Sequence, residues 1–209
     1  MGKLIDLSCA GFAEALASKA PVPGGGGAAA LAGALAVALG SMAANFTAGK
    51  KKYAPVEEAI QRILREGEVL RTRLLDLVDA DALAFEPLSH AYSFPKDDPR
   101  REDILEEATR GACSVPLEIL RCCALVLPLL EELLEKGSRL LITDVGCGAL
   151  LCKAAMECAA MNLFVNTAAL RSRADAAVLE GEADALLALW VPRAEAVAAA
   201  VTSHIRKEH

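Results

Sequence analysis

An aspartate occupies a position in this chain where an apolar residue is expected. From Val56 onward, apolar or small residues recur at alternating steps of three and four, which is the spacing of one face of an α-helix. The series consists of Val56, Ile60, Ile63, Gly67, Leu70, Leu74 and Leu77, and its next two members are Asp81 and Phe85. A carboxylate on a buried helix face loses hydration, so it needs a partner or a raised pKa. The pattern therefore leaves two interpretations of Asp81: a proton-transfer group, or one half of an ion pair with a Lys or Arg of another helix.

The neighbouring carboxylate, Asp79, follows a different pattern. It lies about 200° from Asp81 around the same helix. On that side it aligns with polar residues, namely Arg65, Glu68, Thr72 and Asp76. This alignment predicts that the Asp79 side chain is solvated.

A glycine run, from Pro23 through Gly24, Gly25 and Gly26 to Gly27, leads directly into a predicted helix. Glycines let the backbone approach a ligand closely, and a helix N-terminus presents unpaired N–H groups and positive potential. The run is not a Walker A loop, because no Lys-Ser/Thr pair follows it. It is not a dinucleotide-binding GxGxxG motif either, because no strand precedes it. It is either a contact for an anionic or polar ligand or a structural turn between helices.

Two lysine motifs could contact an anionic ligand. Lys50 and Lys51 belong to a run of three lysines at the far end of the same predicted helix, where they also complement its dipole. A ligand at the other end of that helix could meet them only through a second chain or a long tail. Lys96 follows a rigid Phe-Pro break, and it either points back at a site or is a solvated loop residue.

A third polar group belongs to a later helix. Asp144 lies in a Thr-Asp-Val-Gly sequence that opens this helix, and Asn162 and Asn166 lie four residues apart, on one face of it. Two carboxamides on an otherwise apolar face could bind a polar heterocycle, or could satisfy each other across an interface.

The rest of the chain predicts long helices that position these groups. Aromatic residues make up only 4% of the 209 residues, and no run shows the alternation typical of a strand. We expect one all-α domain, residues 1–209, of about six long helices near residues 4–18, 27–46, 56–92, 100–136, 144–166 and 172–205. Helices this apolar bury more than one face, which favours a homo-oligomer with a large helical interface.

Composition also sets the expected environment. The formal net charge of −6 argues against nucleic acid as a partner. Seven cysteines without CxxC spacing and three distant histidines predict no metal site and a reducing cytoplasm. The N-terminus lacks the apolar core of a signal peptide. The uncharged segment between Lys19 and Lys50 is long enough to cross a bilayer but is mostly alanine and glycine, so we expect no membrane partner.

Taken together, these segments resemble the cyclodeaminase/cyclohydrolase family of folate one-carbon enzymes. That family includes the C-terminal half of formiminotransferase-cyclodeaminase and methenyltetrahydrofolate cyclohydrolases. The matching pieces, in family order, are P-V-P-G-G-G-G-A-A-A-L-A-G, S-M-A-A-N-F-T-A-G-K-K-K-Y, L-V-D-A-D-A-L-A-F, F-P-K, S-V-P-L, T-D-V-G and N-L-F-V-N. They cover roughly residues 20–170.

The resemblance implies an all-helical homodimer that binds a tetrahydrofolate near the subunit interface. The family's acid–base carboxylate matches Asp81, the residue that the helical spacing singles out independently. The expected substrate-binding residues are Pro23, Gly24, Gly25, Gly26, Gly27, Asn45, Lys50, Lys51, Asp79, Lys96, Asp144, Asn162 and Asn166. The chain departs from the family at Gly27, where the family usually has Ser, and at Cys147-Gly148, where it usually has Val-Ala.

The expected activity is that of a methenyltetrahydrofolate cyclohydrolase, which interconverts 5,10-methenyl- and 10-formyltetrahydrofolate. The absence of a fused formiminotransferase half favours this reaction slightly. The alternative enzyme is a formiminotetrahydrofolate cyclodeaminase, which releases ammonia. A third reading, of another class, is a non-catalytic helical dimer that binds a ligand. Neither reaction requires a metal or redox cofactor, so we expect none beyond tetrahydrofolate itself as substrate.

Overall fold

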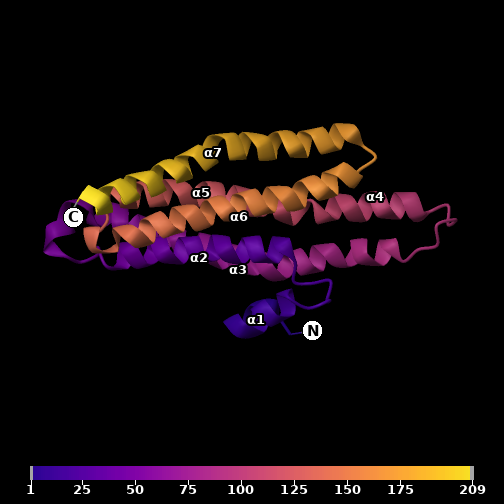
Figure 1. The fold of residues 1–209 in the computed structure, drawn as a ribbon, viewed down its shortest axis with the longest axis horizontal. Helices are drawn as coiled ribbons and strands as arrows, with labels where there is room; N and C mark the ends of the chain where they lie inside the picture. Colours follow the sequence, from indigo (N-terminus) through magenta and orange to yellow (C-terminus); the bar gives the residue numbers. More distant parts are fainter. Residues whose placement is uncertain (1, 208–209) are drawn as a thin grey trace.

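The computed structural model describes residues 2–207, which form a bundle of long helices without a strand (Figure 1). The α-helices are α1 (Cys9–Leu16), α2 (Gly25–Asn45), α3 (Glu57–Tyr92), α4 (Arg101–Ala112), α5 (Ser114–Lys136), α6 (Ile142–Ala169) and α7 (Arg173–Lys207). Of three short 3-10 helices, Leu4–Asp6 precedes α1, Lys51–Val56 precedes α3 and Arg139–Leu141 precedes α6. The predicted all-α class is confirmed.

Helix α2 packs against three of the long helices. It packs along α3 on one side and α6 on the other, while α5 closes the opposite side of the bundle against all three. Helix α7 covers α6 and α5. The core between these helices is aliphatic, and its largest fully buried side chains include Ile60, Leu74, Leu127, Met156 and Leu163.

Small residues allow the close approach of α2 to its neighbours. A β-carbon on Gly33 would lie 3.1 Å from both the Cys123 Sγ and a methyl group of Leu74, and one on Gly40 would lie 2.9 Å from a methyl group of Leu130. Because the distance between helix axes grows with side-chain size, these glycines let α2 approach both α3 and α5 closely.

The structure moves two predicted helix boundaries. Helix α2 begins at Gly25 rather than at Gly27, because the glycines themselves adopt helical geometry. The predicted 100–136 helix divides at Cys113 into α4 and α5, and Pro116 lies in the first turn of α5, where its missing N–H costs nothing. Helix α3 continues through Pro87 to Tyr92.

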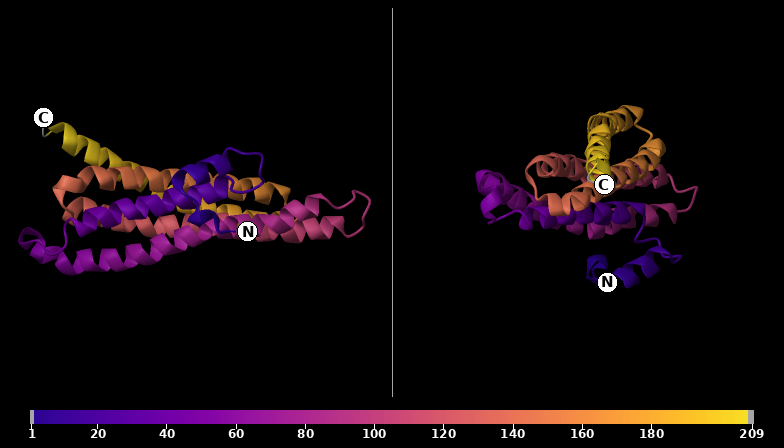
Figure 2. Two further views of the ribbon diagram at one scale, coloured as in Figure 1. Left: turned by 90° about the horizontal axis from the view of Figure 1, so that it is seen from below. Right: turned by 60° about the vertical axis from the view of Figure 1, so that its left-hand side comes forward.

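An N-terminal arm, residues 2–24, precedes the bundle. Its helix α1 is set apart from the long helices in Figure 1 and in the right-hand view of Figure 2. Phe12 is the one buried side chain of α1. The arm therefore contacts the bundle at a few points rather than along a helix.

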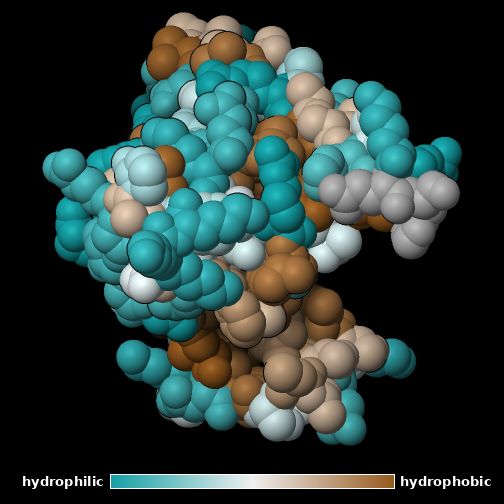
Figure 3. Space-filling view, turned by 90° about the vertical axis from the view of Figure 1, so that its left-hand side faces the viewer, coloured by the Kyte–Doolittle hydropathy of each residue, from teal (hydrophilic) through white to brown (hydrophobic). Residues whose placement is uncertain are grey.

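The outer side of α2 and α6 is apolar and exposed. Both helices lie in front of α3 and α5 in Figure 1. Their exposed large apolar side chains are Leu35, Met42, Leu150, Met161 and Val165, with Phe46 at the end of α2. The end-on view in Figure 3 shows apolar side chains gathered around a hollow between the bundle and the lower lobe that α1 forms. We call the outer side of α2 and α6, with the exposed side chains of Leu35, Met42, Leu150, Met161 and Val165, the α2–α6 face.

Four helical segments are long and apolar enough to cross a membrane by length and composition: Gly25–Asn45, Arg101–Lys136, Arg139–Ala169 and Arg173–Lys207. Packing within the bundle accounts for the apolar character of the second, whose most apolar window is 72% buried. The same packing does not account for the apolar character of Arg173–Lys207, because only 22% of the most apolar window of this segment is buried. The expectation of no membrane partner stays a prediction.

Candidate active site

A cavity of about 150 Å³ lies beside Asp81, where α2 begins. Four parts of the chain enclose it: the end of the N-terminal arm with the first turn of α2, the C-terminal third of α3, the junction of α4 with α5, and the C-terminal half of α6. The lining residues are Pro21, Val22, Gly24, Gly25, Gly26, Asp81, Phe85, Ala112, Pro116, Asn162, Val165 and Asn166. Among them Asp81 is the one side chain with an ionisable group.

The Asp81 carboxylate has one hydrogen-bond donor, the backbone N–H of Gly27, at 2.9 Å from Oδ2. No Lys or Arg pairs with it anywhere in residues 2–207. The alternative interpretation, an ion pair with another helix, is therefore wrong for the described chain. Burial raises the pKa of Asp81, and the Gly27 hydrogen bond opposes that rise only in part.

Gly26 lets the carboxylate lie directly against the α2 backbone. A β-carbon at Gly26 would lie 2.1 Å from Asp81 Oδ1 and 2.5 Å from Cγ, far inside any permitted contact. A β-carbon at Gly27 would meet only ordinary neighbours, the nearest being the Val78 carbonyl oxygen at 3.5 Å. The glycine run thus lets the Asp81 carboxylate pack against the first turn of α2, and the positive potential of the α2 N-terminus acts on this carboxylate.

Two carboxamides complete the polar lining. Asn162 donates from Nδ2 to the Cys158 carbonyl of its own helix at 2.8 Å, and it lies against Gly25. Asn166 donates from Nδ2 to the Ala112 carbonyl at 3.0 Å, which ties α6 to the end of α4. Within residues 2–207 neither amide oxygen accepts a hydrogen bond, so both can accept one from a ligand.

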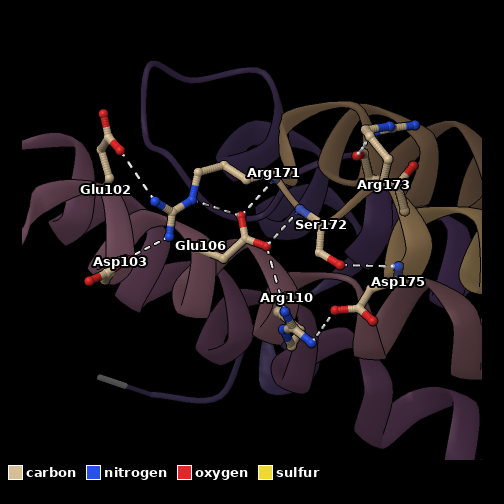
Figure 4. Close-up of polar contacts among 9 residues, drawn as sticks. Glu102, Asp103, Glu106, Arg110, Arg171, Ser172, Arg173 and Asp175 are labelled. Atoms are coloured by element: carbon tan, nitrogen blue, oxygen red, sulfur yellow. Dashed lines mark hydrogen bonds and ion pairs between the residues drawn. The ribbon is translucent and has the colours of Figure 1, made fainter.

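A charged network fixes the wall that α4 contributes (Figure 4). Glu106 accepts the backbone N–H groups of Arg171 at 2.7 Å and of Ser172 at 3.2 Å, and the Arg171 N–H lowers the pKa of Glu106. Arg110 pairs with Asp175 at 2.5 Å. These contacts hold α4 against the turn between α6 and α7, and therefore hold Ala112 at the cavity.

The structure brings together part of the predicted site. Gly24, Gly25, Gly26, Asn162 and Asn166 line the cavity with Asp81. Pro23 and Gly27 are buried next to it, and Gly27 contributes its N–H.

The other predicted residues lie elsewhere in the chain. Asn45, Lys50 and Lys51 are at the opposite end of α2, about 30 Å from Gly25 by helix rise, and Lys50 lies over the Phe46 ring. Asp144 is in the first turn of α6, about 27 Å along the helix from Asn162. Lys96 lies in the exposed loop between α3 and α4.

Asp79 also lies away from the cavity. It is half-buried rather than solvated, and its Oδ1 accepts the backbone N–H of Leu4 at 2.6 Å. The prediction of a solvated side chain is therefore wrong: the helical spacing placed Asp79 correctly on another side of α3 but could not show that the N-terminal arm covers it.

Sequence reasoning missed several apolar wall residues, namely Pro21, Val22, Ala112 and Val165. They come from three distant segments: Pro21 and Val22 open the P-V-P-G-G-G-G piece, Val165 lies in N-L-F-V-N, and nothing in the local pattern marks Ala112. Phe85 and Pro116 carried a signal, since Phe85 continues the helical series of Asp81 and Pro116 belongs to the S-V-P-L piece. Within residues 2–207, no group of three or more His, Cys, Asp or Glu side chains is close enough to hold a metal ion.

Fold and site together define a helical bundle that presents one half-buried carboxylate, a glycine-rich helix start and two carboxamides to a small polar molecule. The sequence profile of the formiminotransferase-cyclodeaminase family matches residues 8–185. The chain therefore belongs to this family of enzymes, as the resemblance predicted.

The similarity of the chain to individual members supports this family assignment. The chain is similar to a methenyltetrahydrofolate cyclohydrolase from Methylorubrum extorquens, with 41% identity over 85% of this chain and 87% of that protein. It is 30% identical to a formimidoyltransferase-cyclodeaminase from Mus musculus over 78% of this chain, but that match covers only 31% of the mouse protein. The crystal structure of a formiminotetrahydrofolate cyclodeaminase from Thermotoga maritima superposes with a TM-score of 0.84 at 30% identity, covering 96% of this chain and all of the other.

Proposed function

We propose that this protein is a methenyltetrahydrofolate cyclohydrolase in which Asp81 acts as general base and acid. The observation that carries the proposal is the half-buried Asp81 carboxylate, without a cationic partner in residues 2–207, in a cavity lined by hydrogen-bonding groups. The 41% identity to a cyclohydrolase, over most of both chains, supports this reaction over its alternative.

The chemistry needs a group that takes a proton and returns it. A water molecule adds to the methenyl carbon between N5 and N10, and Asp81 accepts one of its protons. The bond from this carbon to N5 then breaks, and Asp81 returns the proton to N5. The second water proton leaves to solvent as the formyl group forms on N10. A carboxyl group whose pKa is raised by burial suits both steps, because its two forms are closer in free energy at neutral pH.

The surrounding groups supply orientation. The amide oxygens of Asn162 and Asn166 can accept hydrogen bonds from the amino and ring N–H groups of a pterin, and Phe85 offers an apolar contact. Water, the folate and proton transfer complete the reaction, so the proposal includes no further cofactor. We place the enzyme in the cytoplasm, in keeping with its seven free cysteines.

The cyclodeaminase reaction is the second candidate, favoured by the superposition on the Thermotoga maritima cyclodeaminase over its full length. In that reaction N10 attacks the formimino carbon and its proton passes to the formimino nitrogen. This nitrogen then takes a second proton from Asp81 and leaves as ammonia, which forms the methenyl bridge. Both reactions use the same carboxylate, and they differ in the substrate bound.

The proposal includes a homodimer formed through the α2–α6 face. Leu35 is 51% exposed on α2, and Met161 and Val165 are 68% and 66% exposed on α6. Helix α2 is about 30 Å long and α6 about 42 Å, so at about 10 Å wide the two offer roughly 700 Å² per chain, approaching the area of a stable interface. A cavity of about 150 Å³ encloses only part of a folate, and a second chain at this face would enlarge it. A monomer in sedimentation velocity at micromolar concentration would refute the dimer.

The test is the absorbance of the 5,10-methenyl chromophore. Wild-type protein should accelerate its decay over buffer, and Asp81→Asn should lower kcat by about 10³-fold, because general acid–base catalysis contributes 10²–10⁴. Asp144→Asn, which changes a carboxylate at the far end of α6, is the matched control and should leave kcat unchanged.

Three outcomes would change the assignment. Formation of the chromophore from 5-formiminotetrahydrofolate with release of ammonia, and no decay of the methenyl compound, would replace the first reaction by the second. Equal activity of Asp81→Asn and wild type would remove Asp81 from the mechanism. Binding of folate without either reaction would leave a non-catalytic binding protein.

A further inference from the structure

Asp79 joins two parts of the chain that are 75 residues apart. Its Oδ1 accepts the backbone N–H of Leu4 at 2.6 Å, and the contact is partly buried. Leu4 is the first residue of the 3-10 helix Leu4–Asp6, which packs on α3, and the Leu4 side chain packs against the main core. Asp79 thus anchors the start of the N-terminal arm.

Asp81 anchors the other end of the same arm. The Gly27 N–H, just after the arm enters α2, donates to Asp81 Oδ2 at 2.9 Å. Because residues two apart on a helix point about 200° away from each other, the two carboxylates hold the arm on different sides of α3. Residues 4–27 therefore form a strap that leaves α3 at Asp79 and returns beside Asp81.

The returning part of this strap is a wall of the candidate active site. Pro21, Val22 and Gly24 line the cavity. The strap has few other supports, since α1 is set apart from the long helices and buries only Phe12 (Figures 1 and 2). The placement of this wall therefore depends on the anchors at the two ends of the strap.

We propose that Asp79 is a positioning residue for the Asp81 site: it holds Leu4, Leu4 fixes the strap, and the strap sets the wall formed by Pro21 and Val22. The expected effect on the Michaelis constant rests on the proposed function. The hydrogen bond between Asp79 and Leu4, and its effect on the strap, do not. Loss of the anchor loosens the wall and weakens substrate binding, but leaves Asp81 and its Gly27 hydrogen bond in place. The Michaelis constant should therefore rise, while the pH dependence of kcat stays that of wild type.

The two sides of the contact can be removed separately. Asp79→Ala removes the acceptor. Leu4→Pro removes the donor, and the backbone accepts a proline there, because Lys3 has φ −65° and ψ 139°, the conformation preferred before proline. Leu4→Ala controls for the lost side chain. Asp76→Ala, an exposed carboxylate one turn earlier on α3, is the matched control for charge.

We expect Asp79→Ala and Leu4→Pro each to raise KM about tenfold, in line with the loss of a hydrogen bond to a charged group. The double variant should be no worse than the more affected single variant, since both remove one interaction. Hydrogen exchange in peptides covering residues 4–24 should be faster in both, and Asp76→Ala should match wild type in all measurements.

Additive effects of the two changes, or wild-type KM and exchange in Asp79→Ala, would overturn the proposal. A shifted pH profile of kcat in Asp79→Ala would also overturn it, because Asp79 would then act on the reacting groups. If wild-type protein transforms neither folate, the proposed function fails, and unchanged exchange in the variants would then refute the anchor independently.

Discussion

Gly26→Ala is the sharpest test of how the fold positions the candidate acid. The new methyl group would lie 2.1 Å from Asp81 Oδ1, 2.5 Å from Cγ and 2.7 Å from Oδ2. Non-bonded contacts of a β-carbon essentially never fall below 3.0 Å, so the carboxylate must retreat by about 1 Å or α2 must shift. The change adds one methyl group and removes no functional atom.

The size of the effect follows from that displacement. Misplacing a reacting group by about 1 Å can cost about 10² in rate, so we expect kcat to fall about 100-fold. Helix propensity works in the other direction, since Ala is favoured over Gly by up to about 1 kcal/mol within a helix. Overpacking of this kind costs about 1–3 kcal/mol, which leaves a domain of this size folded.

The assay is kcat for decay of the methenyl chromophore, with thermal unfolding to establish that the variant is folded. Gly27→Ala is the matched control, because its methyl group would meet only atoms at 3.5 Å or beyond and its N–H to Asp81 is kept. It should retain far more activity. A folded Gly26→Ala protein with kcat within about threefold of wild type would refute the reasoning, since catalysis would then not depend on where this carboxylate lies.

Two further predictions concern charge. Because burial raises the pKa of Asp81, the folded protein holds this proton more tightly than the unfolded chain does, so the group costs stability as the pH rises above the ordinary value of 3.8. Asp81→Asn should therefore unfold at a higher temperature than wild type at neutral pH, with the difference vanishing in acid; an unchanged difference across a pH series would contradict this. Lys96→Ala should raise KM for polyglutamylated folate and leave KM for the monoglutamate unchanged, because Lys96 lies in a loop beyond the cavity; equal losses for both would exclude a role limited to the tail.

Much of the helical architecture could be predicted from the sequence, because long periodic segments carry their own signal. The face of α3 from Ile60 through Leu77 is buried as its spacing predicts. The start of α2 was predicted less well, because α2 begins at Gly25 rather than near residue 27. The glycines of residues 25–27 have low helix propensity, yet close packing against Asp81 and Asn162 favours helix there.

Part of the candidate site could likewise be predicted from the sequence, and part could not. Asp81 and the pair Asn162 and Asn166 could be predicted, because each breaks the apolar pattern of its own helix. The remote positions of Lys50 and Lys51 also follow from helix length. The partner of Asp79 could not be predicted, because it is a backbone N–H, which every non-proline residue carries.

Helical spacing along the chain places a carboxylate on the buried face of one helix, and the glycine run marks the start of the helix before it. Tertiary structure alone decided that these two features meet, with Gly27 donating to Asp81 and no cation beside it in residues 2–207. It also decided that the N-terminal arm, whose Leu4 N–H donates to Asp79, lines the cavity through Pro21 and Val22. The physical reason is that helical periodicity is a local property of the chain, whereas desolvation and hydrogen bonding of one carboxylate depend on which other helices pack against it.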